Sequence, residues 1–247
     1  MDRMLYIAMS GAKQTMLAQS ANSNNMANAN TTGFRADLAA FRSMPVYGAG
    51  EPTRVYAMAE RAGVDSSSGA IIPTGRELDV AIKDDGWIAV QTSDGSEAYT
   101  RAGNFKIDAG GVITTRNGLP ILGNGGPIAL PPAEKVEIGT DGTISIRGIG
   151  QSASTLTVID RIKLVKINGN DLIKGTDGLI RKIDGNVATV DASVNLIAGA
   201  LESSNVSAVE SMVSMITLAR QYEAQIKMMK AAEDMDSASS ELLSISG

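Results

Sequence analysis

The adjacent carboxylates of Asp84 and Asp85 could belong to a two-carboxylate hydrolase site, in which one group acts as an acid and the other as a base or nucleophile. Nothing in the sequence shows that another carboxylate faces them, and the following Gly86 marks both as turn residues. The 247 residues contain no histidine and no cysteine, which excludes Ser-His-Asp and Cys-His nucleophiles. Cys/His zinc, haem and iron–sulfur sites are excluded for the same reason. We therefore expect no catalytic residue, no cofactor and no metal.

The segment from Asn168 to Leu179 imitates a calcium-binding repeat, because its aspartates lie among glycines. A true nonapeptide repeat has a period of nine residues, whereas Asp171, Asp177 and Asp184 are separated by six and seven positions. No Asp-x-Asp-x-Asp-Gly calcium loop is present. Hairpin turns explain this pattern better than a metal site.

The charge balance argues against a nucleic-acid partner. The net charge is −5 and the isoelectric point about 4.9, with 22 Lys and Arg spread among 27 Asp and Glu. No apolar run approaches the roughly 18 residues that a membrane span needs. The apolar stretch at residues 4–12 is short for a signal peptide, and Lys13 and Gln14 interrupt it. We expect no nucleic acid, no membrane insertion and no cleaved signal.

The central region is predicted to be an antiparallel β domain, a barrel or a sandwich, over residues 76–201. Asp-Gly and Asn-Gly dipeptides occur eight times there, and they supply the positive φ that two-residue hairpin turns require. The segments between them alternate or are β-branched, as at residues 78–82 and 86–90. Residues 35–75 contain several prolines and glycines and are expected to form an extended linker, with some edge strands.

Both ends of the chain have the spacing of amphipathic helices. At the N-terminal end, Leu5, Met9, Ala12 and Met16 step by four and three residues. Near the C-terminal end the same step continues over three heptads. Neither helix can bury its stripe alone, so we expect the helices to pair with each other, with neighbouring subunits, or both. A contact that does not close on itself builds a helical filament. The C-terminal stripe consists of Val209, Met212, Ile216, Ala219, Tyr222, Ile226 and Met229.

Two features of these ends have alternative interpretations. Five asparagines lie between Asn22 and Asn30, where they indicate either a frayed helix end leading to Gly33 or a row of amides that meets other subunits. Ten of the twelve methionines lie in the two terminal segments. They fit core filling as well as they fit helices that contact several kinds of neighbour.

Three ordered blocks of the sequence resemble the bacterial flagellar rod and hook proteins, and together they span nearly the whole chain. The first resembles the N-terminal signature of that family, the second its β-domain core, and the third its C-terminal signature. The blocks are NMANANTTGFR at residues 25–35; LDVAI at 78–82 with Gly86-Trp87 and YTRAGNF at 99–105; and GALESSNV at 199–206 with RQYEAQ at 220–225.

The resemblance implies a structural subunit of the flagellar basal-body rod that spans the periplasm and transmits torque. It implies polymerisation through the terminal helices, with other proximal and distal rod subunits as partners. It also implies export by the flagellar type III apparatus without a cleaved signal, and no small-molecule substrate. The modest length and the short connection between residues 41 and 78 favour a proximal-rod subunit over a hook subunit. The alternatives are a distal-rod subunit, a β-barrel binding module or hydrolase with a helical stalk, and an adaptor or export chaperone that uses its C-terminal helix.

The expected fold is therefore α+β, with long terminal helices paired in a coiled-coil-like domain around a central antiparallel β domain. Its parts are the N-terminal helix at 1–34, the linker at 35–75, the β domain at 76–201 and the C-terminal helix at 202–247. The signature residues are expected to set register, turns and polar contacts between subunits. The candidate assembly residues are Leu5, Met9, Ala12, Met16, Asn25, Asn28, Thr32, Gly33, Leu201, Glu202, Asn205, Val209, Met212, Ile216, Ala219, Arg220, Tyr222, Ile226 and Met229.

Overall fold

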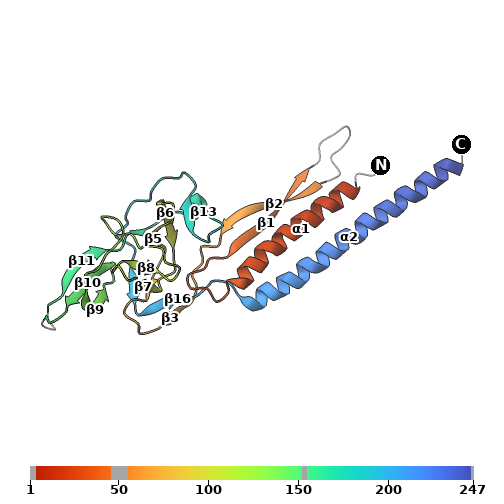
Figure 1. The fold of residues 1–247 in the computed structure, drawn as a ribbon. Coiled ribbons are helices and arrows are strands. Elements are labelled where there is room, and N and C mark those ends of the chain that lie inside the picture. Colours follow the sequence, from red (N-terminus) through yellow and green to blue (C-terminus); the bar gives the residue numbers. More distant parts are fainter. Residues whose placement is uncertain (1–3, 46–54, 152–154, 246–247) are drawn as a thin grey trace. The chain divides into compact units, whose positions relative to one another are not determined.

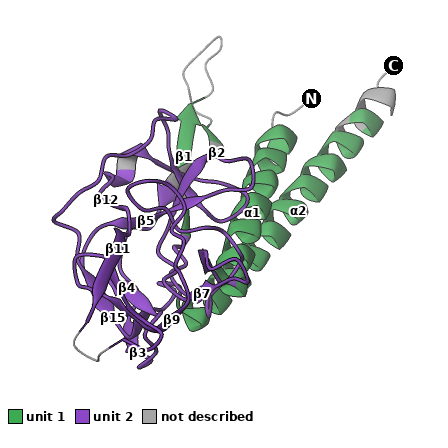
Figure 2. Cartoon of the chain, turned by 60° about the vertical axis from the view of Figure 1, so that its left-hand side comes forward, with its two compact units in different colours: residues 1–27, 37–62, 207–247 green, residues 28–36, 63–206 purple. Residues whose placement is uncertain are grey.

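The computed structural model describes residues 4–45, 55–151 and 155–245, and these form an α+β fold made of two compact units (Figure 2). The first, which we call the helical unit, combines residues 1–27, 37–62 and 207–247. The second, the β unit, combines residues 28–36 and 63–206. The chain therefore passes between the units four times, and each unit is built from segments far apart in the sequence.

The helical unit contains both terminal helices and one long β-hairpin. Helix α1 covers Met4–Ala27 and helix α2 covers Ala208–Ile245, so both predicted helices are present but are shorter than the expected parts at 1–34 and 202–247. Residues 28–34 and 202–206 belong to the β unit instead. The hairpin pairs β1 (Asp37–Pro45) with β2 (Val55–Val64), whose last residues belong to the β unit. Both strands lie within residues 35–75, for which the sequence predicted an extended linker.

Helices α1 and α2 lie side by side and run in opposite directions (Figure 1). Near one end of the pair, the Asn22 side-chain amide donates to the Ser211 carbonyl oxygen at 2.7 Å. Farther along, a Cβ added at Gly11 would lie 2.9 Å from Cδ of Gln225. The helices approach this closely because the buried residues of α1 are small. These residues are Ala8, Ala12, Thr15 and Ala18.

The β unit consists of short antiparallel strands. The largest sheet has five strands in the order β12-β5-β6-β14-β13, and a second has three in the order β11-β10-β9. The remaining strands of this unit form the pairs β15-β4, β16-β3 and β7-β8. The strands are β3 Ile71–Pro73, β4 Val80–Ile82, β5 Trp87–Gln91, β6 Glu97–Thr100, β7 Phe105–Ile107, β8 Ile113–Thr115, β9 Ala133–Ile138, β10 Thr143–Gly148, β11 Thr157–Arg161, β12 Leu164–Val165, β13 Leu172–Lys174, β14 Ile180–Lys182, β15 Leu196–Ala198 and β16 Ala200–Glu202.

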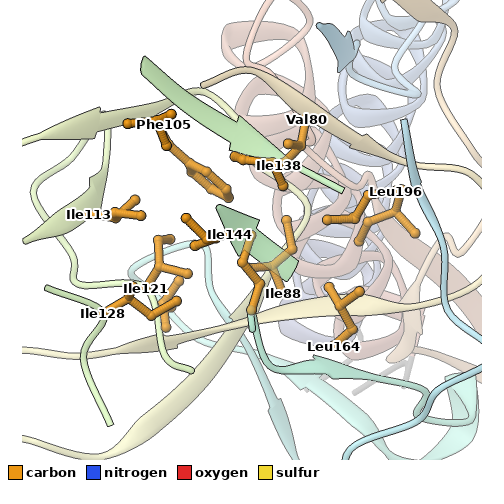
Figure 3. Close-up of a cluster of buried hydrophobic side chains, with 14 of the residues drawn as sticks. Val80, Ile88, Phe105, Ile113, Ile121, Ile128, Ile138, Ile144, Leu164 and Leu196 are labelled. Atoms are coloured by element: carbon orange, nitrogen blue, oxygen red, sulfur yellow. The ribbon is translucent and has the colours of Figure 1, made fainter. Parts of the chain in front are cut away.

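The prediction of antiparallel strands is confirmed, whereas the barrel is not: within the described residues, none of these sheets closes on itself. The sheets instead surround a shared aliphatic core (Figure 3). Ile88, Ile113, Ile121 and Ile144 are fully buried there, together with the ring of Phe105. The β unit is thus stabilised by branched aliphatic side chains from several small sheets.

The Asp-Gly and Asn-Gly dipeptides mark turns, and five of the eight glycines have positive φ. The other three do not, and Gly86 serves a different purpose. A Cβ at Gly86 would lie 2.5 Å from Cγ1 of Val194, so the glycine permits close packing. The five glycines with positive φ are Gly95, Gly118, Gly142, Gly178 and Gly185.

Tyr99 provides a pH-dependent contribution to the stability of the β unit. Its side chain is buried, and its hydroxyl oxygen accepts a hydrogen bond from the Ala188 backbone N–H at 2.7 Å. Burial raises the pKa of Tyr99 to about 12. Because this folded-state pKa exceeds the unfolded value of about 10, the contribution is complete below pH 10 and is lost as pH rises through 12.

We expect Tyr99→Phe to lower the free energy of unfolding at pH 7 by about 1–3 kcal/mol, because the buried Ala188 N–H loses its acceptor. The variant should also lose less stability than the wild type between pH 9 and pH 11. Urea unfolding at pH 7, 9 and 11, followed by the fluorescence of Trp87, measures the two effects. Tyr222→Phe on α2 is the matched control, and equal alkaline losses in all three proteins would contradict the prediction.

Candidate assembly surface and junction cluster

Large apolar side chains of both terminal helices lie exposed on the helical unit. On α1, Leu5 is 42% exposed, Met9 54% and Met16 64%. On α2, Val209 is 71% exposed and Ile216 56%. Soluble monomers rarely expose many large apolar residues on one element pair, and such patches mark interaction sites. We call this set, with Met212, Tyr222 and Ile226 of α2, the apolar surface.

The apolar surface remains uncovered because α1 uses other residues to contact α2. Ala12 is the one predicted α1 residue that is buried, and it lies with Ala8 and Ala18 on the small inner face. On α2, the predicted residues Ala219 and Met229 are half-buried. The predicted residues thus fall into two sets. Ala12, Ala219 and Met229 are buried or half-buried, and the residues of the apolar surface are exposed in the single chain.

Two grooves border the helix pair. One, of about 410 Å³, lies between α1, α2 and the β1-β2 hairpin and includes Ile7, Gly11 and Met228 in its lining. The other, of about 390 Å³, includes Ala18 and Leu218. Both grooves belong entirely to the helical unit; the first has a mostly apolar lining, whereas polar residues such as Asn22 and Gln221 line much of the second.

The asparagines of the N-terminal signature are used within the chain. The side-chain amide of Asn25 donates to the Asp37 carbonyl oxygen at 2.9 Å, and its Oδ1 accepts from the Asp37 N–H at 2.8 Å. This reciprocal pair fixes the start of β1 against the last turn of α1. The Asn28 side chain accepts from the Thr31 hydroxyl at 3.1 Å in the turn after the helix. Thr32 in the same turn is half-buried.

Gly33 ends this turn, and no other residue type fits its position. Its φ is 66°, and a Cβ there would lie 2.3 Å from the carbonyl carbon of Arg101. Its N–H donates to the Glu202 carbonyl oxygen at 2.8 Å. The glycine therefore allows the N-terminal and C-terminal signature segments to meet inside the β unit.

Glu202 lies at the centre of a buried ion cluster. Its side chain is 1% exposed, and Oε1 accepts from Nη2 of Arg35 at 2.6 Å and from the Gly69 N–H at 2.9 Å. Oε2 accepts from Nη1 of Arg101 at 3.1 Å. Burial lowers the pKa of Arg35, and the charge of Arg101 adds to this, whereas Glu202 opposes both. Arg35 also donates to the Ser67 carbonyl oxygen.

Asn205 forms a second centre next to this cluster. Its Oδ1 accepts from the Ala36 N–H at 2.8 Å, and its Nδ2 donates to the carbonyl oxygens of Asp65 at 3.2 Å and Ser67 at 3.1 Å. Its own N–H donates to the Phe34 carbonyl oxygen at 3.3 Å. We call Arg35, Arg101, Glu202 and Asn205 the junction cluster.

The sequence singled out Glu202 and Asn205 but missed both arginines as site residues. Arg35 and Arg101 lie in the signature blocks, yet nothing in their spacing pairs them with residue 202. Of the other candidates, Leu201 is half-buried on β16 opposite Ile72, and Arg220 is exposed on α2.

Three family models match successive parts of the chain. Residues 5–35 match "Flagella basal body rod protein", residues 81–146 "Flagellar hook protein FlgE/F/G D1 domain", and residues 197–242 "Flagellar basal body rod FlgEFG protein C-terminal". A relative from Escherichia coli K12, named "Flagellar basal-body rod protein FlgF", is 42% identical over 252 residues and covers 100% of both chains. The chain belongs to the flagellar basal-body rod FlgEFG family.

Other relatives agree with this assignment. A FlgF protein from Salmonella typhimurium LT2 is 40% identical over 100% of both chains. A FlgG protein from Bacillus subtilis 168 is 32% identical over 95% of this chain and 97% of the relative. The junction cluster draws Arg35, Arg101 and Glu202 from three separate regions that the rod-family models match. It is therefore built from the family's shared regions.

Asp84 and Asp85, the carboxylates considered for a hydrolase site, do not line any of the four cavities described here. Asp84 and Asp85 are exposed. Four cavities formed by described residues each have at most one carboxylate in their lining, Asp37 in one and Asp108 in another. Across the same residues, no group of three acidic side chains is placed to hold a metal ion. No described helix combines the length and apolar character of a membrane span.

Proposed function

We propose that this protein is a structural subunit of the proximal rod of the bacterial flagellum. It polymerises through its terminal helices into the axial shaft that transmits torque for swimming. The observation that carries this proposal is the apolar surface of α1 and α2, which a single chain leaves exposed. Its similarity to rod proteins named FlgF, at 42% and 40% identity, exceeds that to the FlgG protein at 32%. This difference favours the proximal over the distal rod.

Assembly supplies the burial that the isolated chain lacks. Fully burying one exposed Leu, Ile or Met side chain contributes roughly 1.5–3 kcal/mol. Six residues that are between 42% and 71% exposed can offer part of this contribution to neighbouring subunits: Leu5, Met9, Met16, Val209, Met212 and Ile216. Such contacts can form a coiled-coil-like packing between helices of adjacent copies, and flexible methionines suit surfaces that differ from one neighbour to the next.

The remaining candidate residues take defined places in this proposal. Ala12, Ala219 and Met229 hold the helix pair of one subunit together, and the outer residues meet other subunits. The partners are other proximal and distal rod subunits and the flagellar type III export apparatus. The subunit is exported without a cleaved signal and resides in the basal body, where the rod spans the periplasm. Its role is structural, with no catalytic step.

A binding module or hydrolase with a helical stalk fits the structure less well. The space at the centre of the β unit is filled by side chains such as Ile88, Ile121 and Ile144. A ligand-binding interior would need a cavity with converging polar groups. The four cavities described above each have at most one carboxylate in their lining.

The decisive experiment is to locate the chain in intact basal bodies. A strain lacking the gene is complemented with the wild-type chain or with a chain lacking residues 209–247. We expect the first to restore swimming and to give density for the chain in the proximal rod. The truncated chain should restore neither. Normal swimming with the truncated chain would refute assembly through α2, and density only in the distal rod would refute the proximal assignment.

A further inference from the structure

The chain passes between its units at four places, and each place lies in or close to a segment of the β unit that the junction cluster connects. Gly33 follows the passage from α1, and its N–H donates to the Glu202 carbonyl oxygen. Ala36 precedes β1, and its N–H donates to Asn205 Oδ1 while its carbonyl oxygen accepts from the Asp65 N–H at 2.9 Å. Asp65 follows β2, and Asn205 precedes α2. Three short segments, at 33–36, 65–69 and 202–205, are thus joined to one another.

The carboxylate of Glu202 forms ion pairs with both buried arginines of this arrangement. Arg35 is 2% exposed and Arg101 3%, and both buried cations form an ion pair with Glu202, while the charge of Asp65 adds a weaker attraction for Arg35. The Nε atoms of both arginines are buried and have no hydrogen-bond partner within the described residues. Removing the carboxylate would leave two buried guanidinium groups without their ion-paired partner, and only the weaker attraction of Asp65 for Arg35 would remain. Removing Arg35 would leave a balanced pair of Glu202 and Arg101.

The cluster is separate from the aliphatic core. The core consists of residues such as Val80, Ile88 and Leu196, and no member of the junction cluster belongs to it. Glu202 instead contacts Arg35 and Gly69 of the connecting segments, and also Arg101, whose guanidinium lies over Trp87 of a second buried cluster. Loss of its charge should therefore loosen these segments while the core persists.

We propose that Glu202 is a positioning residue whose carboxylate holds segments 33–36, 65–69 and 202–205 in one fixed arrangement. It thereby fixes the spacing at which the chain leaves the β unit toward α1, the β1-β2 hairpin and α2. This inference rests on the proposed function, because a subunit that transmits torque needs stiff connections where its chain changes unit. Asn205 supports the same arrangement from the other side through its side-chain amide.

The test is hydrogen exchange on the purified full-length protein in three variants. Glu202→Gln keeps the shape of the side chain and removes its charge. Arg35→Met leaves the balanced pair of Glu202 and Arg101. Glu97→Gln is the matched control, because Glu97 is a mostly buried carboxylate of the β unit that pairs with Lys163 at 2.8 Å, away from the junction cluster.

We expect Glu202→Gln to speed exchange at the N–H groups of Gly33, Ala36 and Asn205 at least tenfold. Exchange at Ile113 and Ile121 in the aliphatic core should stay within about twofold. Arg35→Met should give a smaller change at the same three positions, and Glu97→Gln none. The fluorescence of Trp87, the one tryptophan, should shift in Glu202→Gln, because the Arg101 guanidinium lies 5.4 Å from the centre of its ring.

Unchanged exchange at the three junction positions in Glu202→Gln would overturn the proposal. Equal acceleration in the core would also overturn it, because Glu202 would then stabilise the β unit as a whole. If Arg35→Met loosened the junction as much as Glu202→Gln, the charge argument would be wrong.

Swimming assays separate this inference from the proposed function. Cells carrying Glu202→Gln should build few functional rods, whereas Glu97→Gln cells should swim normally. If the junction loosens and the cells still swim normally, the positioning role is refuted and the rod function stands. If the wild-type chain itself builds no rod, the proposed function fails while the exchange data still test the role of Glu202 in the fold.

Discussion

A Gly33→Ala variant will be destabilised by about 2–5 kcal/mol, because the added methyl group meets two separate penalties. The φ of 66° places an alanine in the left-handed region, which costs roughly 1–2 kcal/mol. In addition, the new Cβ would lie 2.3 Å from the carbonyl carbon and 2.4 Å from the carbonyl oxygen of Arg101. Backbone atoms cannot move aside as a flexible side chain can, so the segment must shift.

Urea unfolding of the purified protein measures this loss, and Gly118→Ala provides the matched control. Gly118 has a φ of 85°, yet nothing lies within 4 Å of its Cβ position. The control therefore reports the backbone penalty alone, about 1–2 kcal/mol. The difference between the variants gives the cost of the clash. Equal losses in both would show that the Gly33 segment moves freely away from Arg101, contrary to the packing described above.

An Ile216→Asp variant will abolish rod assembly and swimming without unfolding the subunit. Ile216 is 56% exposed in the single chain, so the substitution should change its free energy of unfolding by no more than about 0.5 kcal/mol. In the proposed assembly the same side chain is covered by a neighbour. An aspartate there buries an unpaired charge, which costs several kcal/mol at each contact and repeats along the shaft.

Circular dichroism and hydrogen exchange of the purified variant check the fold, and swimming with basal-body isolation checks assembly. Ala231→Asp introduces the same charge at an exposed position of α2 outside the apolar stripe and should leave both unchanged. Normal swimming in Ile216→Asp cells would show that Ile216 lies outside the contact between subunits. An unfolded Ile216→Asp subunit would show that the residue serves the single chain.

Local sequence patterns predicted the secondary structure well where local forces decide it. Apolar residues at steps of three and four predicted α1 and α2, because one face of each helix must be apolar. The Asp-Gly and Asn-Gly dipeptides predicted turns at Gly95, Gly142 and Gly178, where only glycine takes positive φ without strain. Whether the β sheets close into a barrel could not be predicted this way. Closure depends on which distant strands pair, as β12 pairs with β5.

The candidate site was harder to predict, because burial depends on partners distant in the sequence. The large residues Met9 and Met16 defined the expected helix seam, whereas the helices approach through Ala8 and Ala18. Small residues carry little weight in a hydrophobic pattern, although they permit the closest helix contacts. The buried ion cluster shows the same limit. Glu202 is 101 residues from Arg101 and 167 from Arg35, and no local pattern joins them.

The division of α1 into a small inner face and a large outer face has an evolutionary consequence. Alanines at positions 8, 12 and 18 specify how the chain pairs its own helices, and bulky residues at 5, 9 and 16 specify what the outside presents. The two specifications occupy different positions, so mutation can alter one while the other is preserved. Duplicated genes can thus diverge into subunits that bind different neighbours but keep the same pairing of their own helices. A shaft built from several kinds of related protein requires such subunits.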